Sequence, residues 1–235
     1  MKIDIITLFP KMFSGPFDES IVKRAVDNKF VDITIHNLRK WTKDKHKTVD
    51  DRPFGGGKGM ILRVDVVDRA ISNFKFPISK KKRIILLSPQ GKVFDQQKAR
   101  ELSKLDHLIF ISGHYEGYDE RIRKHLTDEE ISIGDYVLTG GELPTMVIVD
   151  SVVRLLPGVL TEEATQNESF SQLKTKNSKI ENLLDYPTYT RPETYKGWKV
   201  PSVLLSGNHA EIVKWRMQKA SQKTHKIRPD LGKKR

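Results

Sequence analysis

Two segments near the start of the chain alternate apolar and polar side chains. Residues 3–7 and 31–35 carry isoleucine, valine or threonine at every second position, which is the spacing of a half-buried β-strand. Between them, residues 20–28 are predicted to form a helix. The pattern indicates a β-α-β unit at the start of the fold.

Two later segments are short and continuously apolar. Ile84 to Leu87 and Leu108 to Ile111 each end at a small polar residue, as expected for strands buried on both faces of a parallel sheet. Residues 95–105, between them, read as an exposed helix. From Met146 to Leu156, apolar side chains recur at helical spacing until Pro157-Gly158 stops the helix. We therefore expect an α/β domain over residues 1–160.

The composition changes after this domain. Residues 161–179 are rich in Thr, Glu, Asn, Gln, Ser and Lys and are interpreted as a flexible linker. Ile180 to Leu184 and Glu211 to Gln222 are expected to be helical. Residues 180–235 are thus predicted to form a small, basic, mainly helical domain.

The charge is positive and unevenly distributed. The chain has 42 Lys or Arg against 30 Asp or Glu, a net charge of +12. Residues 211–235 hold nine basic against two acidic residues, and residues 39–58 hold seven against three, with Trp41 and Phe54 among them. Basic residues mixed with aromatic ones suit a phosphate backbone and unstacked bases. A solvated helix face with a frayed tail is the alternative for the C-terminal run.

Several classes of protein are excluded or left without support. The absence of cysteine excludes disulfides, thiolate metal sites and a cysteine nucleophile. No apolar run approaches the roughly 18 residues of a membrane span, so we expect a cytoplasmic protein. The signatures of dinucleotide-binding folds, P-loops, hydrolase elbows and zincins are missing, and the scattered histidines specify no metal site.

Glycine-rich loops are the strongest site candidates. Glycine allows backbone groups to approach a ligand closely, and α/β folds bind ligands where strands end. The loops are Asp50 to Met60, Ser88 to Gly91, Ser112 to Arg121 and Ser132 to Gly141.

These loops resemble, in order and spacing, those of the bacterial tRNA (guanine(37)-N(1))-methyltransferase family of the SPOUT superfamily. The resemblance continues through Asp150 to Leu160, Asp185 to Pro192 and Leu205 to Ile212, so it covers nearly the whole chain. It implies a parallel sheet with a deep trefoil knot that binds S-adenosylmethionine in a bent form. It also implies a flexible linker, a helical tRNA-binding C-terminal domain, and a homodimer with the active site between subunits.

The resemblance carries over to individual positions. The positions matched to the S-adenosylmethionine-binding loops are Leu87, Ser88, Pro89, Gly91, Gly113, Tyr115, Glu116, Gly117, Ser132, Ile133, Gly134, Asp135, Tyr136, Val137, Leu138, Gly140, Gly141 and Pro144. The positions expected on the tRNA side are Asp50, Arg52, Asp185, Tyr189, Arg191, Asn208 and His209. Packing of Tyr189 and His209 within the small domain is the alternative for those two. The basic segment 39–58 and the C-terminal tail are expected to contact phosphates.

The chemistry requires two more groups. Methylation of guanine N1 removes a proton and moves negative charge towards O6, so a carboxylate base and a cationic partner for O6 are needed. The resemblance assigns the base to Glu168, where relatives usually carry aspartate, and the O6 partner to Arg154; a helix-end surface arginine is the alternative for Arg154. The family's activity is also associated with Mg²⁺, for which no carboxylate cluster is present.

The chain departs from the family pattern at three further places. His114 and Lys58 stand where relatives usually have arginine and proline, and residues 171–182 form a longer, lysine-bearing segment. Other functions remain open at this point. They are a SPOUT methyltransferase with a different RNA target, a non-enzymatic RNA-binding protein of the same fold, and an electrostatic binder of any nucleic acid.

Overall fold

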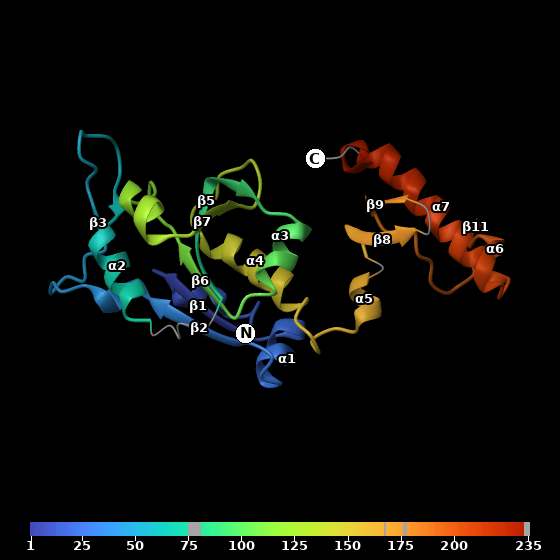
Figure 1. The fold of residues 1–235 in the computed structure, drawn as a ribbon, viewed down its shortest axis with the longest axis horizontal. Helices are drawn as coiled ribbons and strands as arrows, with labels where there is room; N and C mark the ends of the chain where they lie inside the picture. Colours follow the sequence, from blue (N-terminus) through green and yellow to red (C-terminus); the bar gives the residue numbers. More distant parts are fainter. Residues whose placement is uncertain (75–80, 167, 176–177, 233–235) are drawn as a thin grey trace. The chain divides into compact units, whose positions relative to one another are not determined.

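The computed structural model describes residues 1–74, 81–166, 168–175 and 178–232, and the chain divides into two compact units, Met1–Leu160 and Thr161–Arg235 (Figure 1). Lys233, Lys234 and Arg235 of the basic tail, and residues 167, 176 and 177 of the expected linker, lie outside the described residues. Among the described helices, none is both long and apolar enough to cross a membrane.

The first unit is built on a five-stranded parallel sheet with the strand order β2-β1-β6-β5-β7. The strands are β1 (Lys2–Thr7), β2 (Asp32–Asn37), β5 (Lys82–Val93), β6 (His107–Ser112) and β7 (Glu129–Ser132). The four strands expected from the apolar patterns are all present. The prediction of a parallel sheet is confirmed.

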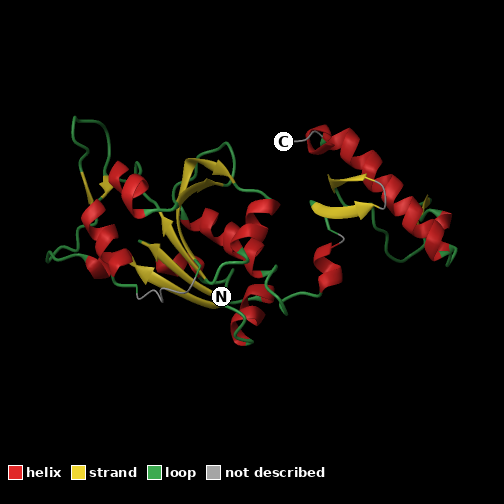
Figure 2. Ribbon diagram, viewed as in Figure 1, coloured by secondary structure: helices red, strands yellow, loops and turns green. Residues whose placement is uncertain are grey.

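Helices cover both faces of this sheet (Figure 2). On β6, Leu108 and Phe110 pack against one helical layer, whereas Ile109 and Ile111 pack against the other. The first layer contains α1 (Ser20–Asp27), α3 (Gln96–Leu102), α4 (Glu142–Val153) and the short η1 (Pro10–Phe13). The second contains α2 (Val64–Ser72), η2 (Leu38–Trp41) and η3 (Ile122–Leu126). Both faces are buried, which is why the β5 and β6 segments are apolar without alternation.

A small hairpin extends from the second layer. Strands β3 (Asp50–Asp51) and β4 (Ile61–Leu62) pair antiparallel, and Phe54 in the loop between them is fully exposed. The N–H of Glu116 donates to the carbonyl of Met60 (3.1 Å). The loop at residues 52–60 is therefore joined by backbone to the loop that follows β6.

The second unit contains short elements and one long helix. They are α5 (Glu162–Gln166), β8 (Ser171–Thr175), β9 (Ser178–Leu183), β10 (Thr194–Tyr195), β11 (Trp198–Lys199), α6 (Ser202–Leu205), α7 (His209–Ile227) and η4 (Pro229–Gly232). The predicted helix at residues 211–222 is confirmed within α7. The helix expected from Ile180 to Leu184 is wrong, because residues 178–183 form a strand that pairs with β8. That pairing gives hydrogen-bond partners to backbone N–H and C=O groups that would have none in a five-residue helix.

Candidate functional site

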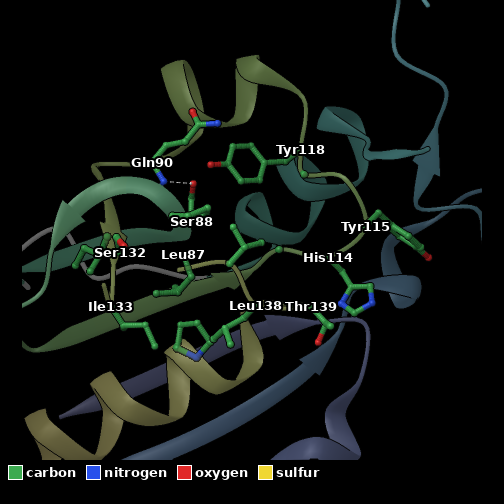
Figure 3. A pocket seen from close by; sticks show the side chains of 18 of the residues that line it. Leu87, Ser88, Gln90, His114, Tyr115, Tyr118, Ser132, Ile133, Leu138 and Thr139 are labelled. Carbon is green, nitrogen blue, oxygen red and sulfur yellow. Dashed lines mark hydrogen bonds between the residues drawn. The ribbon is translucent and has the colours of Figure 1, made fainter. Parts of the chain in front are cut away.

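Three loops of the first unit surround a cavity of about 250 Å³ (Figure 3). They are the loop within β5 and the loops that follow β6 and β7. Because these three strands are neighbours and parallel, their carboxyl ends meet at one edge of the sheet. The order of the strands, rather than the sequence of any one loop, creates the cavity.

Most of the expected loop positions line this cavity. Sixteen of the eighteen do so: Leu87, Ser88, Pro89, Gly113, Tyr115, Glu116, Gly117, Ser132, Ile133, Gly134, Tyr136, Val137, Leu138, Gly140, Gly141 and Pro144. Gly91 and Asp135 are not among the lining residues. Six lining residues were missed by the sequence reasoning: Gln90, His114, Tyr118, Glu120, Ile131 and Thr139. All six lie within or directly beside the predicted loops, and this proximity was the available signal.

Gly91 has a structural task instead. Leu87 and Lys92 both pair with Ile131 of β7, so residues 88–91 leave the sheet between them. A Cβ atom on Gly91 would lie 2.5 Å from the backbone nitrogen of Ile131. Only glycine allows the β5 loop to pass this close to β7, because contacts this short essentially never occur for a real Cβ atom.

Backbone contacts also join the loops that follow β6 and β7. The N–H of Gly141 donates to the carbonyl of Gly113 (2.7 Å). A Cβ atom on Gly141 would lie 2.7 Å from the nitrogen of Gly113, whereas a Cβ atom on Gly113 would make only ordinary contacts. We call this backbone contact the Gly113–Gly141 seam. It depends on the absence of a side chain at Gly141 more than at Gly113.

A phenol and a carboxylate support the β5 loop. The hydroxyl of Tyr118 donates to Glu130, and Figure 3 shows the Tyr118 ring beside Ser88 and Gln90. Burial, and then the hydrogen bond to Glu130, raise the pKa of Tyr118 well above its usual value. The N–H of Gln90 donates to Ser88 Oγ (3.0 Å). Tyr118 thus remains a neutral hydrogen-bond donor at physiological pH.

A buried carboxylate stands behind the cavity wall. Glu142, the first residue of α4, is fully buried, and its Oε1 accepts a hydrogen bond from Thr7 Oγ1 (2.7 Å). Its Oε2 has no hydrogen-bond partner within the described part of the chain and lies 3.9 Å from His114 Nδ1. A Cβ atom on Gly140 would lie 2.4 Å from that Oε2 and 2.6 Å from that Nδ1. The glycine leaves the space in which carboxylate and imidazole face each other.

The His114 ring is held in place by aromatic neighbours. Its centroid lies 4.7 Å from that of Phe9 and 5.3 Å from that of Tyr115. The ring lines the cavity on one side and faces Glu142 on the other.

The two expected catalytic residues lie in different units. Arg154 follows the last residue of α4 and is half-buried. Glu168, in the second unit, is half-buried beside a chain contact in which Ser169 Oγ accepts from the N–H of Asp185 (3.0 Å). The N–H of Phe170 donates to the carbonyl of Leu183 (2.9 Å). The structure therefore brings the Glu168 segment next to the Asp185 segment.

The remaining positions expected on the tRNA side fall into two groups. In the first unit, Asp50 is half-buried in β3 and Arg52 is exposed. In the second unit, Tyr189 and Arg191 are exposed, and the Tyr189 ring lies 6.5 Å from that of Trp215.

Two of these positions form the start of α7. Asn208 caps the helix, because its Oδ1 accepts from the N–H of Glu211 (3.3 Å). The capping bond uses the side-chain oxygen of Asn208, so its NH₂ group is the part of the side chain that could donate to RNA. His209 is exposed at the first position of the helix.

Metal binding finds no support in the described residues. Among them, no group of three or more His, Cys, Asp or Glu side chains is arranged to hold a metal ion.

Comparisons with known proteins agree with one another over the whole chain. Residues 1–234 match the sequence profile of the family described as tRNA (Guanine-1)-methyltransferase TrmD. A protein of Bacillus pumilus is 55% identical over 98% of this chain and 91% of its own length. Proteins of Mycoplasmopsis agalactiae (54%, covering 98% of this chain and 96% of that protein) and Dehalococcoides mccartyi (52%, covering 100% and 91%) are similarly close. All three are named tRNA (guanine-N(1)-)-methyltransferase.

Proposed function

Because this chain belongs to the tRNA (guanine-1)-methyltransferase TrmD family, we propose that its target is the guanosine immediately 3′ of the anticodon, at position 37 of tRNA. The protein is a tRNA guanine-N1-methyltransferase, and the family implies S-adenosylmethionine as the methyl donor. The observation that carries the proposal is the cavity formed by the three glycine-rich loops, which supplies a donor site at the strand ends.

The residues around the cavity fit a donor of this kind. The Gly113–Gly141 seam brings backbone amides and carbonyls to the wall, where they can bind an adenine edge and a ribose. Leu87, Ile133 and Leu138 supply apolar contacts for the adenine ring. When bound, S-adenosylmethionine supplies a methyl group on a sulfonium sulfur. The loops hold and orient that molecule.

Glu168 acts as the base, and Arg154 stabilises charge. Glu168 accepts the N1 proton of guanine as the methyl group is transferred, and Arg154 stabilises the negative charge that develops on O6. Glutamate reaches one methylene further than the aspartate usual in relatives. The hydrogen bond between Ser169 Oγ and Asp185 N–H holds the backbone next to Glu168 and so limits where this longer side chain places its carboxylate.

The active enzyme is a homodimer with the active site between subunits. Helix α4 supports this proposal because its solvent-facing side also carries apolar side chains. Its inner residues are buried in the core, yet Leu143 and Val147 are exposed. Tyr136, Val137 and Leu138 in the preceding loop are exposed as well. Several exposed apolar side chains on one helix and the loop before it are typical of an interface between protein chains.

The remaining family features are part of the same proposal. The loops at residues 88–91, 113–117 and 133–141 belong to a deep trefoil knot. Residues 1–160 form the methyltransferase domain, residues 161–179 link it to the C-terminal domain, and residues 180–235 bind tRNA. The reaction takes place in the cytoplasm, where tRNA is processed.

Transfer of labelled methyl groups to two tRNA transcripts tests the target. One transcript carries guanosine and the other adenosine immediately 3′ of the anticodon. Label on the guanosine transcript alone is the expected result. Label on both transcripts, or on neither, would overturn the assignment of position 37.

Glu168→Gln tests the base in the same assay. The variant is expected to lose about 10²- to 10⁴-fold in single-turnover rate while retaining tRNA binding. Glu162→Gln, an exposed glutamate of α5, is the matched control and is expected to keep the wild-type rate. An unchanged rate in Glu168→Gln would remove Glu168 from the mechanism.

A further inference from the structure

The second unit displays a run of exposed aromatic side chains. Residues 188–199 are all exposed, and they include Tyr189, Tyr195 and Trp198. Trp198 is 70% exposed and Tyr195 is 54% exposed. Large aromatic side chains are normally well buried, so several of them on one short exposed stretch indicate a binding surface.

A tight hairpin presents two of these rings. Strands β10 and β11 pair antiparallel with Tyr195 opposite Trp198, so both side chains project from the same face. The turn consists of Lys196 and Gly197, with φ of 50° and 84°. Two successive residues with positive φ form the short turn that suits a two-stranded ribbon. The N–H of Val200 donates to the carbonyl of Glu193 (2.9 Å) and closes the other end.

The two rings form an open platform. Their centroids lie 5.9 Å apart, with an interplanar angle of 59°. Exposure of 54% and 70% leaves much of each ring open to a ligand. Since the hairpin backbone is closed at both ends, the rings are displayed with little loss of conformational entropy on binding.

Positive charge surrounds the platform. Lys196 Nζ lies 5.5 Å from the centroid of the Tyr195 ring, and Lys199 is exposed on β11. Residues 186–216 contain five Lys or Arg against two Asp or Glu. Lysine is depleted at the centre of protein–protein interfaces, whereas aromatic rings with flanking lysines suit RNA, whose bases stack and whose phosphates are negative.

We propose that the hairpin of residues 194–199 is an RNA-binding element that stacks an unpaired base of the substrate on the Tyr195–Trp198 platform. Lys196 and Lys199 contact the neighbouring phosphates. The inference rests on the proposed tRNA substrate and adds a contact outside the donor cavity and outside the residues assigned to the chemistry. The hairpin is expected to act on binding and to leave the methyl-transfer step unchanged.

Substitution of Trp198 in the full-length protein tests the platform. Trp198→Ala is expected to weaken binding of fluorescently labelled tRNA about tenfold, which is the effect expected for the loss of one stacked base. Trp198→Phe keeps a ring and is expected to restore most of the affinity. Val93→Ala removes an apolar side chain of comparable exposure (57%) at the end of β5 in the first unit and serves as the control. In kinetics, Trp198→Ala should raise KM for tRNA and leave kcat unchanged.

The lysines are tested by salt dependence. Affinity for tRNA falls as salt rises, and each phosphate contact adds somewhat less than one to the steepness of log affinity against log salt. The double substitution of Lys196 and Lys199 to Gln is therefore expected to make this slope shallower by about 1–2. An unchanged slope would overturn the assigned phosphate contacts.

Further outcomes separate this inference from the proposed function. If wild-type protein methylates the guanosine transcript and Trp198→Ala binds tRNA as tightly as wild type, the inference is wrong and the function stands. If Trp198→Ala instead lowers the molecular mass measured by light scattering, the hairpin is a protein interface and the inference is also wrong. Hairpin-dependent RNA binding without methylation would contradict the proposed target and leave the inference standing.

Discussion

The two units of this protein hold their shape in different ways. Among the residues whose burial the structure describes, all buried apolar side chains except Leu183 and Ala220 belong to the first unit. The first unit therefore has a sheet core on which its loops can form a defined cavity. The second unit relies on hairpins, a helix cap and one long helix, and it leaves aromatic and basic side chains exposed.

This difference corresponds to two kinds of ligand. A small donor molecule needs a cavity whose walls are fixed within a fraction of an ångström, and packed cores supply such rigidity. A tRNA is a large polyanion that is recognised across a surface, for which exposed rings and cations are sufficient. The comparison predicts that substitutions in the first unit change stability and cavity shape, whereas surface substitutions in the second change binding.

The largest expected effect is loss of core packing in the first unit. Phe110 is fully buried, and Phe110→Ala is expected to destabilise this unit by about 3–5 kcal/mol because it removes a large side chain and leaves a cavity. Calorimetry should show the transition of the first unit shifted down. Phe54→Ala, at a fully exposed phenylalanine of the same unit, should leave both transitions in place. Equal effects of the two substitutions would contradict the comparison.

The next effect concerns the seam between the loops. Gly141→Ala is expected to cost up to about 3 kcal/mol and to weaken binding of S-adenosylhomocysteine, because its Cβ would overlap the backbone of Gly113. Gly113→Ala is the matched control, with only ordinary contacts expected at its Cβ. Urea unfolding and calorimetric titration measure both quantities. Similar stability losses in the two variants would show that the seam is not held by Gly141.

The carboxylate of Asp4 is expected to make the stability of the first unit sensitive to acid. Asp4 is buried on β1, and its carboxylate is 2.6 Å from His36 Nε2, 2.7 Å from His107 Nε2 and 3.0 Å from Lys2 Nζ. Burial by itself raises the pKa of Asp4, but the hydrogen bonds from His107, His36 and Lys2 outweigh it and hold the pKa well below its usual range.

The sign of the pH effect follows from this shift. The unfolded chain takes up the proton of Asp4 at a higher pH than the folded chain does. The stabilisation is therefore present above about pH 4 and is lost as the pH falls towards the folded pKa. Between pH 5 and 2, wild type should lose on the order of 2 kcal/mol more than Asp4→Asn in urea unfolding of the first unit. Parallel pH profiles for the two proteins would contradict this role of Asp4.

The smallest expected effect is a difference in stability between Thr→Val substitutions at two buried threonines. Thr145 Oγ1 donates to Gly141 O and lies 2.9 Å from Ser112 Oγ, a hydroxyl that can rotate to another partner. Thr224 Oγ1 accepts from the N–H of Leu184 (2.8 Å), a backbone donor with a fixed direction. Thr224→Val should therefore cost about 1 kcal/mol more than Thr145→Val, measured on the transition of the unit concerned. The opposite order would show that the hydroxyl network around Thr145 is the more rigid one.

Local patterns in the sequence predict four of the five strands of the sheet and miss β7 (Glu129–Ser132). The strands at the start of the chain and the apolar β5 and β6 segments follow from alternation and from burial on two faces, which are properties of each segment alone. The loops around the cavity also follow from glycine content and family resemblance. The helix predicted from Ile180 to Leu184 is wrong because a five-residue segment with three apolar side chains gives no clear period, and only the pairing of β9 with β8 decides between helix and strand.

By itself, the sequence determined that this protein has a parallel α/β unit, glycine-rich loops at its strand ends and a basic C-terminal part. These features depend on side-chain spacing and composition, which are local. Only the tertiary structure decided that Gly91 packs on Ile131, that Gly140 leaves room for Glu142 and His114 to face each other, and that Tyr195 and Trp198 lie side by side and exposed. Each of these depends on strand order or on the absence of a covering neighbour, and contacts between distant segments leave no periodic signal in the chain.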